Sequence, residues 1–274
     1  MKLQFTNGYY PDFSKISRIL KFLSDKDYKS NVLYDEIVAA VGIPYRQVRS
    51  IISQMMGFGL VQAHGNILTN LGKIIANADP FFQKPQSLWI IHYQVSSDPN
   101  LLVWNRIIHK VFPVHDAFTL DFVIEQYFAD LESRYSEETY KKKLPREIRA
   151  VLDSYVDSEL SRLNLLVSHE KDSYQKLTPL ELPILVFLYA LINFRDCFYS
   201  GSTAINVENL HRDPNSPGVV FGLLEYDLRS FLSSLVNRDL IRLERFGNLD
   251  QVRFSDVRNQ EKVLQLIYGS NHVN

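Results

Sequence analysis

One pattern occurs three times along the chain and restricts the folds open to it. In each copy, amphipathic helices are followed by a short apolar strand, a polar turn and a second strand. The copies cover roughly residues 12–78, 118–178 and 205–268. Helices followed by a two-stranded hairpin are typical of the winged helix-turn-helix, whose wing is the hairpin. The sequence therefore predicts a mainly α fold with small β-hairpin wings, in which two or three winged helix-turn-helix modules surround a helical centre.

The first copy has the clearest element boundaries. Gly42-Ile43-Pro44 separates its second and third helices, because glycine suits a helix C-cap and proline suits the start of the next helix. The third helix is predicted from Tyr45 to about Met56. Residues 60–63 and 67–69 are predicted to pair as strands, with His64-Gly65-Asn66 as the turn between them.

The predicted third helix has an apolar face and a polar face. The apolar face recurs at helical spacing through Val48, Ile51, Ile52 and Met55. The opposite face carries Arg46, Arg49, Ser50 and Ser53. Residues 1–80 contain nine Lys and Arg and six Asp and Glu, whereas the whole chain has a net charge of −1. This is the one sizeable segment in which both charge and geometry favour nucleic acid.

These features predict that the first copy binds double-stranded DNA. The third helix would enter the major groove through Arg46, Arg49, Ser50 and Ser53, because recognition helices in this architecture present their outer face there. Tyr45, at the start of that helix, is predicted to lie near the sugar-phosphate backbone. The wing-tip residues His64 and Asn66 are predicted to contact the minor groove or phosphates.

The other two copies are weaker candidates for DNA binding. The outer face of the second copy mixes Arg146 and Arg149 with Asp153 and Asp157, and these acids would repel phosphates. The third copy offers a second basic surface. Its predicted DNA-binding residues are Arg229 on a helix and Arg242 and Arg245 on the wing.

Two apolar segments lie outside the three copies and are predicted to be buried helices. They are Leu88–Val95 and Leu182–Phe194. The second is the most apolar stretch, yet it is too short to span a bilayer. The predicted organisation has five segments: 1–78, 79–117, 118–178, 179–204 and 205–274. With no signal-peptide-like opening, the sequence favours a cytoplasmic protein with no membrane partner.

No constellation of residues points to catalysis or to a cofactor. The sequence contains no phosphate-binding Gly-x-x-x-x-Gly-Lys loop, no Gly-x-Ser-x-Gly and no His-Glu-x-x-His. Cys197, the single cysteine, excludes a cysteine-rich zinc site and is predicted to be a small core residue. His92 is predicted to be a core histidine bonded to a backbone group. We expect no metal, no cofactor and no enzymatic activity.

Two strings carry a family resemblance. Asp79-Pro80-Phe81-Phe82, continued by Ser87–Gln94, and Asp213–Phe221 resemble the signature of a bacterial family of unknown function. That family occurs in gene clusters for DNA phosphorothioation, a sulfur modification, and for phage defence, beside genes resembling phosphoadenosine-phosphosulfate reductases. The resemblance covers most of the chain. It implies a biological context and supplies no catalytic residues.

Two functions from different classes are consistent with the sequence. In the first, the chain is a non-enzymatic DNA-binding component of a bacterial DNA-modification or phage-defence system. In the second, it is a scaffold or adaptor whose winged modules dock other proteins of the same operon. A DNA reader needs Lys and Arg gathered on one face, whereas a scaffold tolerates the near-neutral balance of the whole chain. The sequence leaves a homodimer open.

Overall fold

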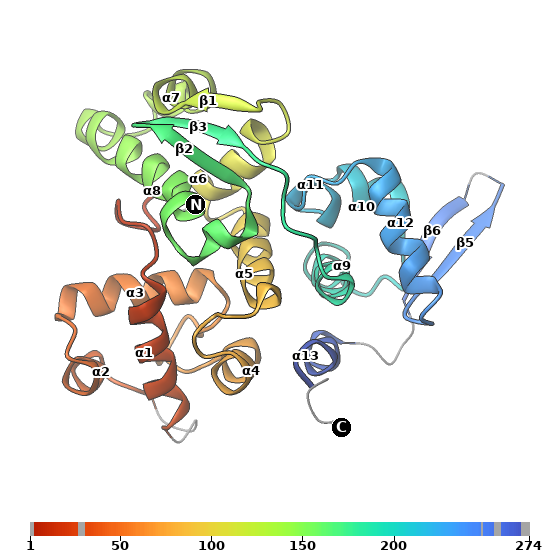
Figure 1. Cartoon of the computed structure of the whole chain (residues 1–274), viewed down its shortest axis with the longest axis horizontal. Coiled ribbons are helices and arrows are strands. Elements are labelled where there is room, and N and C mark those ends of the chain that lie inside the picture. Colours follow the sequence, from red (N-terminus) through yellow and green to blue (C-terminus); the bar gives the residue numbers. More distant parts are fainter. Residues whose placement is uncertain (1–2, 27–30, 248, 255–258, 270–274) are drawn as a thin grey trace. The chain divides into compact units, whose positions relative to one another are not determined.

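The computed structural model describes residues 3–26, 31–247, 249–254 and 259–269 of the chain. The chain divides into two compact units, Met1–Leu180 and Glu181–Asn274. Helices dominate each unit, and each contains one small three-stranded antiparallel sheet (Figure 1). The expectation of a mainly helical fold with small β elements is confirmed. Among the described helices, none has the length and apolar character needed to cross a membrane.

Four helices open unit 1. They are α1 (Phe13–Ser24), α2 (Tyr34–Val41), α3 (Tyr45–Gly57) and α4 (Asn70–Ala78). The predicted strand pair between α3 and α4 is reduced to a single bridge, Val61 to Leu68. The second strand has no room to continue, because Thr69 already caps α4 by accepting a hydrogen bond from Gly72 N at 3.0 Å.

The centre of unit 1 is formed by α5 (Pro85–Ser97), α6 (Leu102–Arg106) and a π-helical turn, Ile107–Val111. The predicted buried helix over Leu88–Val95 is thus confirmed. His92 is 2% exposed, so its place in the core is confirmed as well. Its Nδ1 lies 2.7 Å from the hydroxyl of Tyr155.

The Tyr155 hydroxyl joins two helices in this core. Besides its contact with His92, it accepts a hydrogen bond of 2.8 Å from Trp104 Nε1. We expect Tyr155→Phe to lower the free energy of unfolding by about 2 kcal/mol, because the buried His92 ring and Trp104 indole both lose the hydroxyl as a hydrogen-bond partner. Urea denaturation measures the change. A loss below about 0.5 kcal/mol would mean that water or another group replaces the hydroxyl.

The rest of unit 1 contains α7 (Leu120–Tyr127), α8 (Leu144–Asp157) and a sheet of strand order β1-β3-β2. The strands are β1 (Ala117–Thr119), β2 (Leu166–Glu170) and β3 (Ser173–Lys176). Helix α7 ends at Tyr127, and a 3₁₀ turn at Ala129–Leu131 follows it. The β2–β3 hairpin was predicted, whereas β1 was not, because three residues carry too little periodicity to be recognised.

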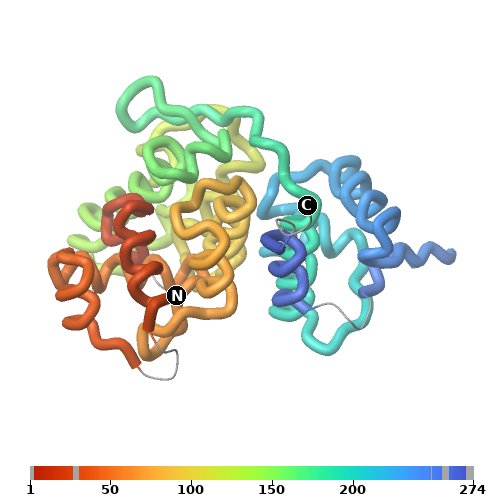
Figure 2. The backbone as a smooth tube through the Cα atoms, turned by 60° about the horizontal axis from the view of Figure 1, so that its bottom comes forward, coloured from red at the N-terminus to blue at the C-terminus, as the bar shows by residue number. Residues whose placement is uncertain are grey.

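Unit 2 is arranged around α9 (Ile184–Phe198), the predicted buried helix. Packed on α9 are α11 (Pro217–Val220), α12 (Glu225–Val236) and α13 (Gln260–Tyr268), and α13 lies alongside it in both ribbon views (Figures 1 and 2). The other elements are β4 (Ala204–Asn206), α10 (Val207–Arg212), β5 (Arg242–Phe246) and β6 (Leu249–Arg253). The sheet order is β4-β6-β5, which confirms the predicted third hairpin.

The prediction for Cys197 is wrong. This residue is exposed in the last turn of α9, next to the exposed Asp196 and Phe198. The apolar run of the sequence ends at Phe194, and from Arg195 onward the helix is no longer buried. A cysteine beyond the end of an apolar run therefore belongs to the surface.

Candidate nucleic-acid interface

The loop before α3 fixes the direction of that helix. Gly42 has φ 64° and ψ 30°, the left-handed conformation that glycine adopts without a Cβ clash, and its N–H donates to the Val38 carbonyl at 2.9 Å. Ile43 is buried, and Pro44 then precedes the first helical residue, Tyr45. The guanidinium of Arg18 on α1 donates to the Val41 carbonyl. These contacts hold α3 against the rest of the helical group.

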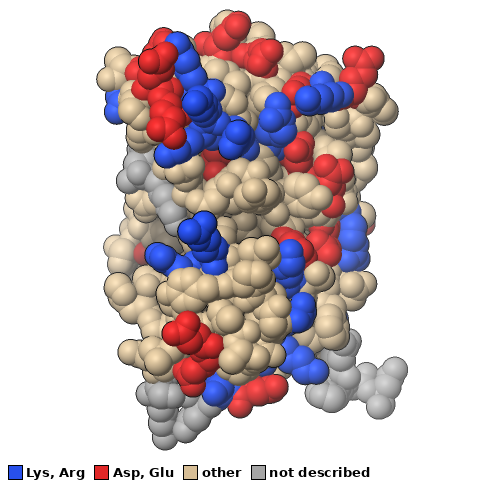
Figure 3. Space-filling model, turned by 90° about the vertical axis from the view of Figure 1, so that its left-hand side faces the viewer, with Lys and Arg blue, Asp and Glu red and all other residues tan. Residues whose placement is uncertain are grey.

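The two faces of α3 are arranged as predicted. Its inner residues Val48, Ile51, Ile52 and Met55 are all buried. Arg46 and Arg49 are exposed, and neither forms a hydrogen bond or an ion pair with any residue that the structure describes. Figure 3 looks onto the side of the molecule that bears α2, α3 and α8, where Lys and Arg side chains stand in separate groups with acidic side chains among them.

The remaining predicted residues of α3 are partly engaged. The Tyr45 ring is 44% exposed and meets the Tyr34 ring edge-on, at 5.8 Å between centroids. Ser50 and Ser53 are half-buried, and Ser50 Oγ accepts a hydrogen bond of 3.0 Å from Asn7 Nδ2. The outer face of α3 is thus an arginine pair flanked by a tyrosine and two hydroxyls.

The two predicted wing-tip residues have different environments. His64 is exposed, but Asn66 is 6% exposed and its Nδ2 donates to the Val32 carbonyl at 2.7 Å. The Val32 N–H in turn donates to the Gly65 carbonyl at 2.9 Å. These two hydrogen bonds attach the turn at residues 64–66 to the segment before α2. The Asn66 amide is therefore already engaged, and of the two predicted residues only His64 presents its side chain to solvent.

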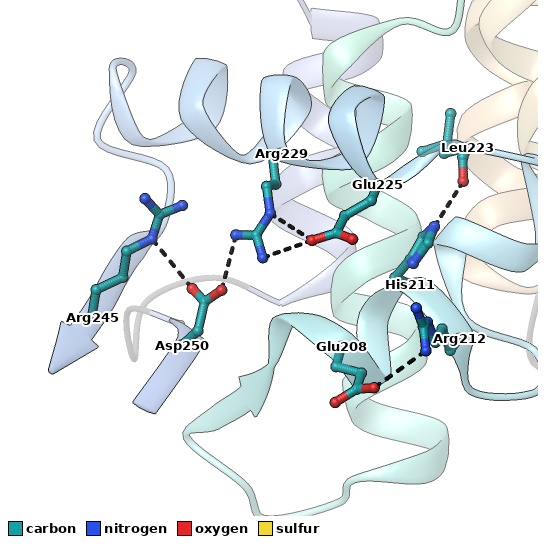
Figure 4. Close-up of polar contacts among 8 residues, drawn as sticks. All are labelled: Glu208, His211, Arg212, Leu223, Glu225, Arg229, Arg245 and Asp250. Carbon is teal, nitrogen blue, oxygen red and sulfur yellow. Dashed lines mark hydrogen bonds and ion pairs between the residues drawn. The ribbon is translucent and has the colours of Figure 1, made fainter. Parts of the chain in front are cut away.

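The arginines of the third copy are largely neutralised by acids. Arg229 Nη1 lies 2.9 Å from Asp250 and its Nη2 lies 3.0 Å from Glu225, while Arg245 Nε lies 3.3 Å from Asp250 (Figure 4). Arg229, Glu225 and Asp250 border a cavity of about 300 Å³ within unit 2, which is also lined by Glu208, His211 and Arg212, whereas Arg245 does not line it. Arg242 is exposed on β5. Paired guanidinium groups attract phosphate less strongly than free ones.

The β5–β6 hairpin holds a further ion pair whose strength can be tested by pH. Arg253 Nε lies 2.6 Å from Glu244 and lowers the pKa of that carboxyl to about 2, from 4.5. A lowered pKa in the folded state stabilises the fold above pH 4.5, and this contribution is lost as the pH falls towards 2. We expect Glu244→Gln to flatten the dependence of the urea midpoint on pH in that window. Parallel curves for parent and variant would show that the pair adds nothing.

Two histidines near the middle of the sequence, His109 and His115, have separate partners. His109 Nδ1 lies 2.8 Å from the Asn105 carbonyl, and His115 Nε2 lies 2.6 Å from the Tyr127 hydroxyl. Burial lowers the pKa of His109. Within the described ranges, no three His, Cys, Asp or Glu side chains are grouped so that they could hold a metal ion.

Sequence reasoning missed Glu147, which is completely buried in α8. It lies on the same face as Leu144, Ile148 and Val151, so the helical periodicity assigns a carboxyl group to an apolar face. An acidic residue at an inward position signals a polar partner, because an unpaired buried charge is very costly. That signal was present in the sequence.

The chain matches one protein family by sequence and two solved structures by fold. Residues 20–268 match the profile of a family described as "Protein of unknown function (DUF4007)". Magnesium ion-bound SspB has the same fold, with a TM-score of 0.76 and 15% identity, over 97% of this chain and 87% of that chain. A second SspB structure gives a TM-score of 0.73 and 16% identity over the same shares. No curated protein matches the sequence.

Proposed function

Because the chain belongs to the DUF4007 family of proteins of unknown function, we propose that it is a non-enzymatic DNA-binding component of a bacterial DNA-modification or phage-defence system. The context comes from the resemblance of its Asp79–Phe82 and Asp213–Phe221 strings to a family of phosphorothioation gene clusters. The DNA-binding role comes from the residues of α3. Residues 12–78 are taken as a winged helix-turn-helix with α3 as its recognition helix.

The observation that carries the proposal is the unpaired arginine pair on the outer face of α3. Arg46 and Arg49 are exposed and form no ion pair within the part of the chain that the structure describes. The helix would place both guanidinium groups in the major groove, where arginine binds guanine edges or phosphates. Tyr45 would lie beside the backbone, and His64 would contact a phosphate or the minor groove.

The arginines of the third copy are weaker candidates for DNA contact than those of α3. Arg229 and Arg245 share Asp250, and Arg229 also contacts Glu225. A phosphate approaching this surface would have to replace existing carboxylate partners. The surface of α3 offers its charge without that competition, so it is the better candidate for the first contact with DNA.

A scaffold function is the second candidate, and one feature of unit 2 favours it. Leu224 and Tyr226 at the start of α12 are 72% and 81% exposed, and Phe246 at the end of β5 is 87% exposed. Large exposed apolar side chains of this kind are typical of protein-docking surfaces. Proteins of the same operon, or a second copy of this chain, are the candidate partners.

Fluorescence anisotropy with a random-sequence duplex tests the proposal. At low salt we expect binding. The affinity should fall as a power of the salt concentration. The same duplex carrying phosphorothioate linkages tests whether the modification is sensed. Absence of binding to both duplexes at low salt would overturn the DNA-binding role. Co-purification with operon partners would then support the scaffold.

The likeness to a magnesium-bound SspB gives a direct check on the non-enzymatic part of the proposal. Supercoiled plasmid incubated with the protein and Mg²⁺ should remain supercoiled at a protein concentration that saturates binding. If nicked or linear plasmid forms with Mg²⁺ and does not form when a chelator is added, the chain acts on DNA as an enzyme.

A further inference from the structure

A looped segment, residues 5–10, contacts both α3 and α8 in the folded chain, and we call it the strap. The carboxylate of the buried Glu147 accepts three backbone N–H groups from it, Phe5 at 2.7 Å, Thr6 at 2.6 Å and Gly8 at 3.3 Å. Asn7 and Gly8 have φ values of 56° and 79°, which bends the chain around this carboxylate. The hydrogen bonds fix the strap to the first turn of α8.

The strap is also fixed to α3. Gln54 Nε2, which is buried, donates to the Tyr9 carbonyl at 3.3 Å, and Asn7 Nδ2 donates to Ser50 Oγ at 3.0 Å. The Phe5 ring is buried beneath the strap, 6.0 Å from the ring of Phe58. The strap is therefore held from both sides, and its exposed side chains have defined positions next to the outer face of α3.

Arg146 lies directly across the strap from α3. A Cβ on Gly8 would be only 3.3 Å from Arg146 Cβ, so this arginine packs against the strap. Arg146 is exposed and has no hydrogen-bond or ion-pair partner among residues 3–26, 31–247, 249–254 and 259–269. Arg46 and Arg49 share the outer face of α3 with Ser50, which the strap contacts, and Arg46 lies one helical turn before Ser50. Three unpaired arginines thus flank the strap, two on α3 and one on α8.

The acidic residues of α8 do not cancel this charge. Asp153 accepts a hydrogen bond of 2.8 Å from the Tyr174 hydroxyl, and Arg149 binds Asp172 at 2.6 Å. Asp153 and Asp157 follow Arg146 by seven and eleven residues, about 10 and 16 Å along the helix axis. At physiological salt, exposed charges that far apart are largely screened from one another. The outer face of α8 therefore carries a positive charge, unpaired among the described residues, at the start of the helix, at Arg146, and its acidic residues lie farther along the helix.

We propose that the strap and Arg146 form a second part of the duplex-binding surface. Arg146 binds a backbone phosphate adjacent to those contacted by α3, and Tyr9, which is 76% exposed, donates its hydroxyl to the same strand. The inference rests on the proposed function of α3. Glu147 is a positioning residue, since its buried carboxylate accepts strap N–H groups and thereby fixes the strap.

Anisotropy titrations of the full chain on one duplex, at several salt concentrations, test this surface. Arg146→Ala should weaken binding about fivefold near 0.15 M salt and make the slope of log affinity against log salt shallower by about 0.9. Arg146→Lys should keep the slope, because it keeps the charge. Tyr9→Ala should weaken binding about threefold with an unchanged slope, because it removes an uncharged contact.

Lys110→Ala is the matched control, because Lys110 is exposed on the π-helical turn after α6 and its loss removes one equal charge. It should leave the slope unchanged. If Arg146→Ala binds as the parent does while Arg46→Ala/Arg49→Ala is weakened, the strap surface is refuted and the function of α3 stands. If Lys110→Ala weakens binding as much as Arg146→Ala, the effect is one of overall charge and the strap surface is again refuted. If the parent itself does not bind duplex, the proposed function fails.

Discussion

Replacing Arg46 and Arg49 together with alanine is expected to weaken duplex binding on the order of 30-fold at about 0.15 M salt. Each phosphate contact contributes about 0.9 to the slope of log affinity against log salt, so the slope should become shallower by about 2. Both side chains are exposed and unpaired among the described residues, so folding should be nearly unaffected. Anisotropy titrations over a range of salt give both quantities.

Two matched variants separate charge from geometry. Arg46→Lys/Arg49→Lys keeps both charges and should restore the slope, while any bidentate guanine contact remains lost at a cost of about 1–3 kcal/mol. Lys110→Ala/Arg238→Ala removes two exposed charges from other elements and should bind as the parent does. If the double alanine variant retains parental affinity at every salt concentration, α3 is not the DNA reader. Arg229, Arg242 and Arg245 would be tested next, and the scaffold would become the better explanation.

Glu147→Ala is expected to lower the free energy of unfolding by about 4 kcal/mol. The change leaves the N–H groups of Phe5, Thr6 and Gly8 without their acceptor and opens a cavity beneath the strap. Urea denaturation followed by circular dichroism measures the loss. The neighbouring Arg146→Ala is the control, and its effect should stay below about 0.5 kcal/mol because the side chain is exposed.

The isosteric Glu147→Gln adds a pH test. Burial raises the pKa of the Glu147 carboxyl, and the strap N–H groups oppose that rise. A raised pKa means that the penalty for ionising the folded carboxyl accumulates as the pH rises above the unfolded value of 4.5. The difference in stability between parent and Gln variant should therefore shift in favour of Gln as the pH rises from about 4 to 7. A pH-independent difference would contradict the assigned burial cost.

The elements that the sequence predicted well are those whose signals are local. The helix α3 was bounded correctly because Gly42 and Pro44 act on their own backbone angles, and its two faces follow from the 3.6-residue period. The buried helices α5 and α9 and the β5–β6 hairpin were found for the same reason. Each signal extends over fewer than about 15 residues, and tertiary contacts did not override it.

The candidate site was predictable only in part. The exposure of Arg46 and Arg49 follows from helix periodicity, but the neutralisation of Arg229 depends on Asp250, 21 residues away on β6. The engagement of Asn66 depends on Val32, 34 residues earlier in the chain. No local pattern encodes either pairing, because hydrogen bonds and ion pairs are set by which surfaces meet when the helices pack.

The sequence by itself determined the mainly helical class, the outer face of α3 and the family resemblance, because all three depend on residue order within short windows. Tertiary structure alone decided which arginines remain free. It brought the strap, 137 or more residues away in the chain, onto Glu147, and it thereby placed Arg146 beside α3. The physical reason is that a buried carboxylate must find donors, and only the folded chain shows that these donors are the backbone N–H groups of Phe5, Thr6 and Gly8.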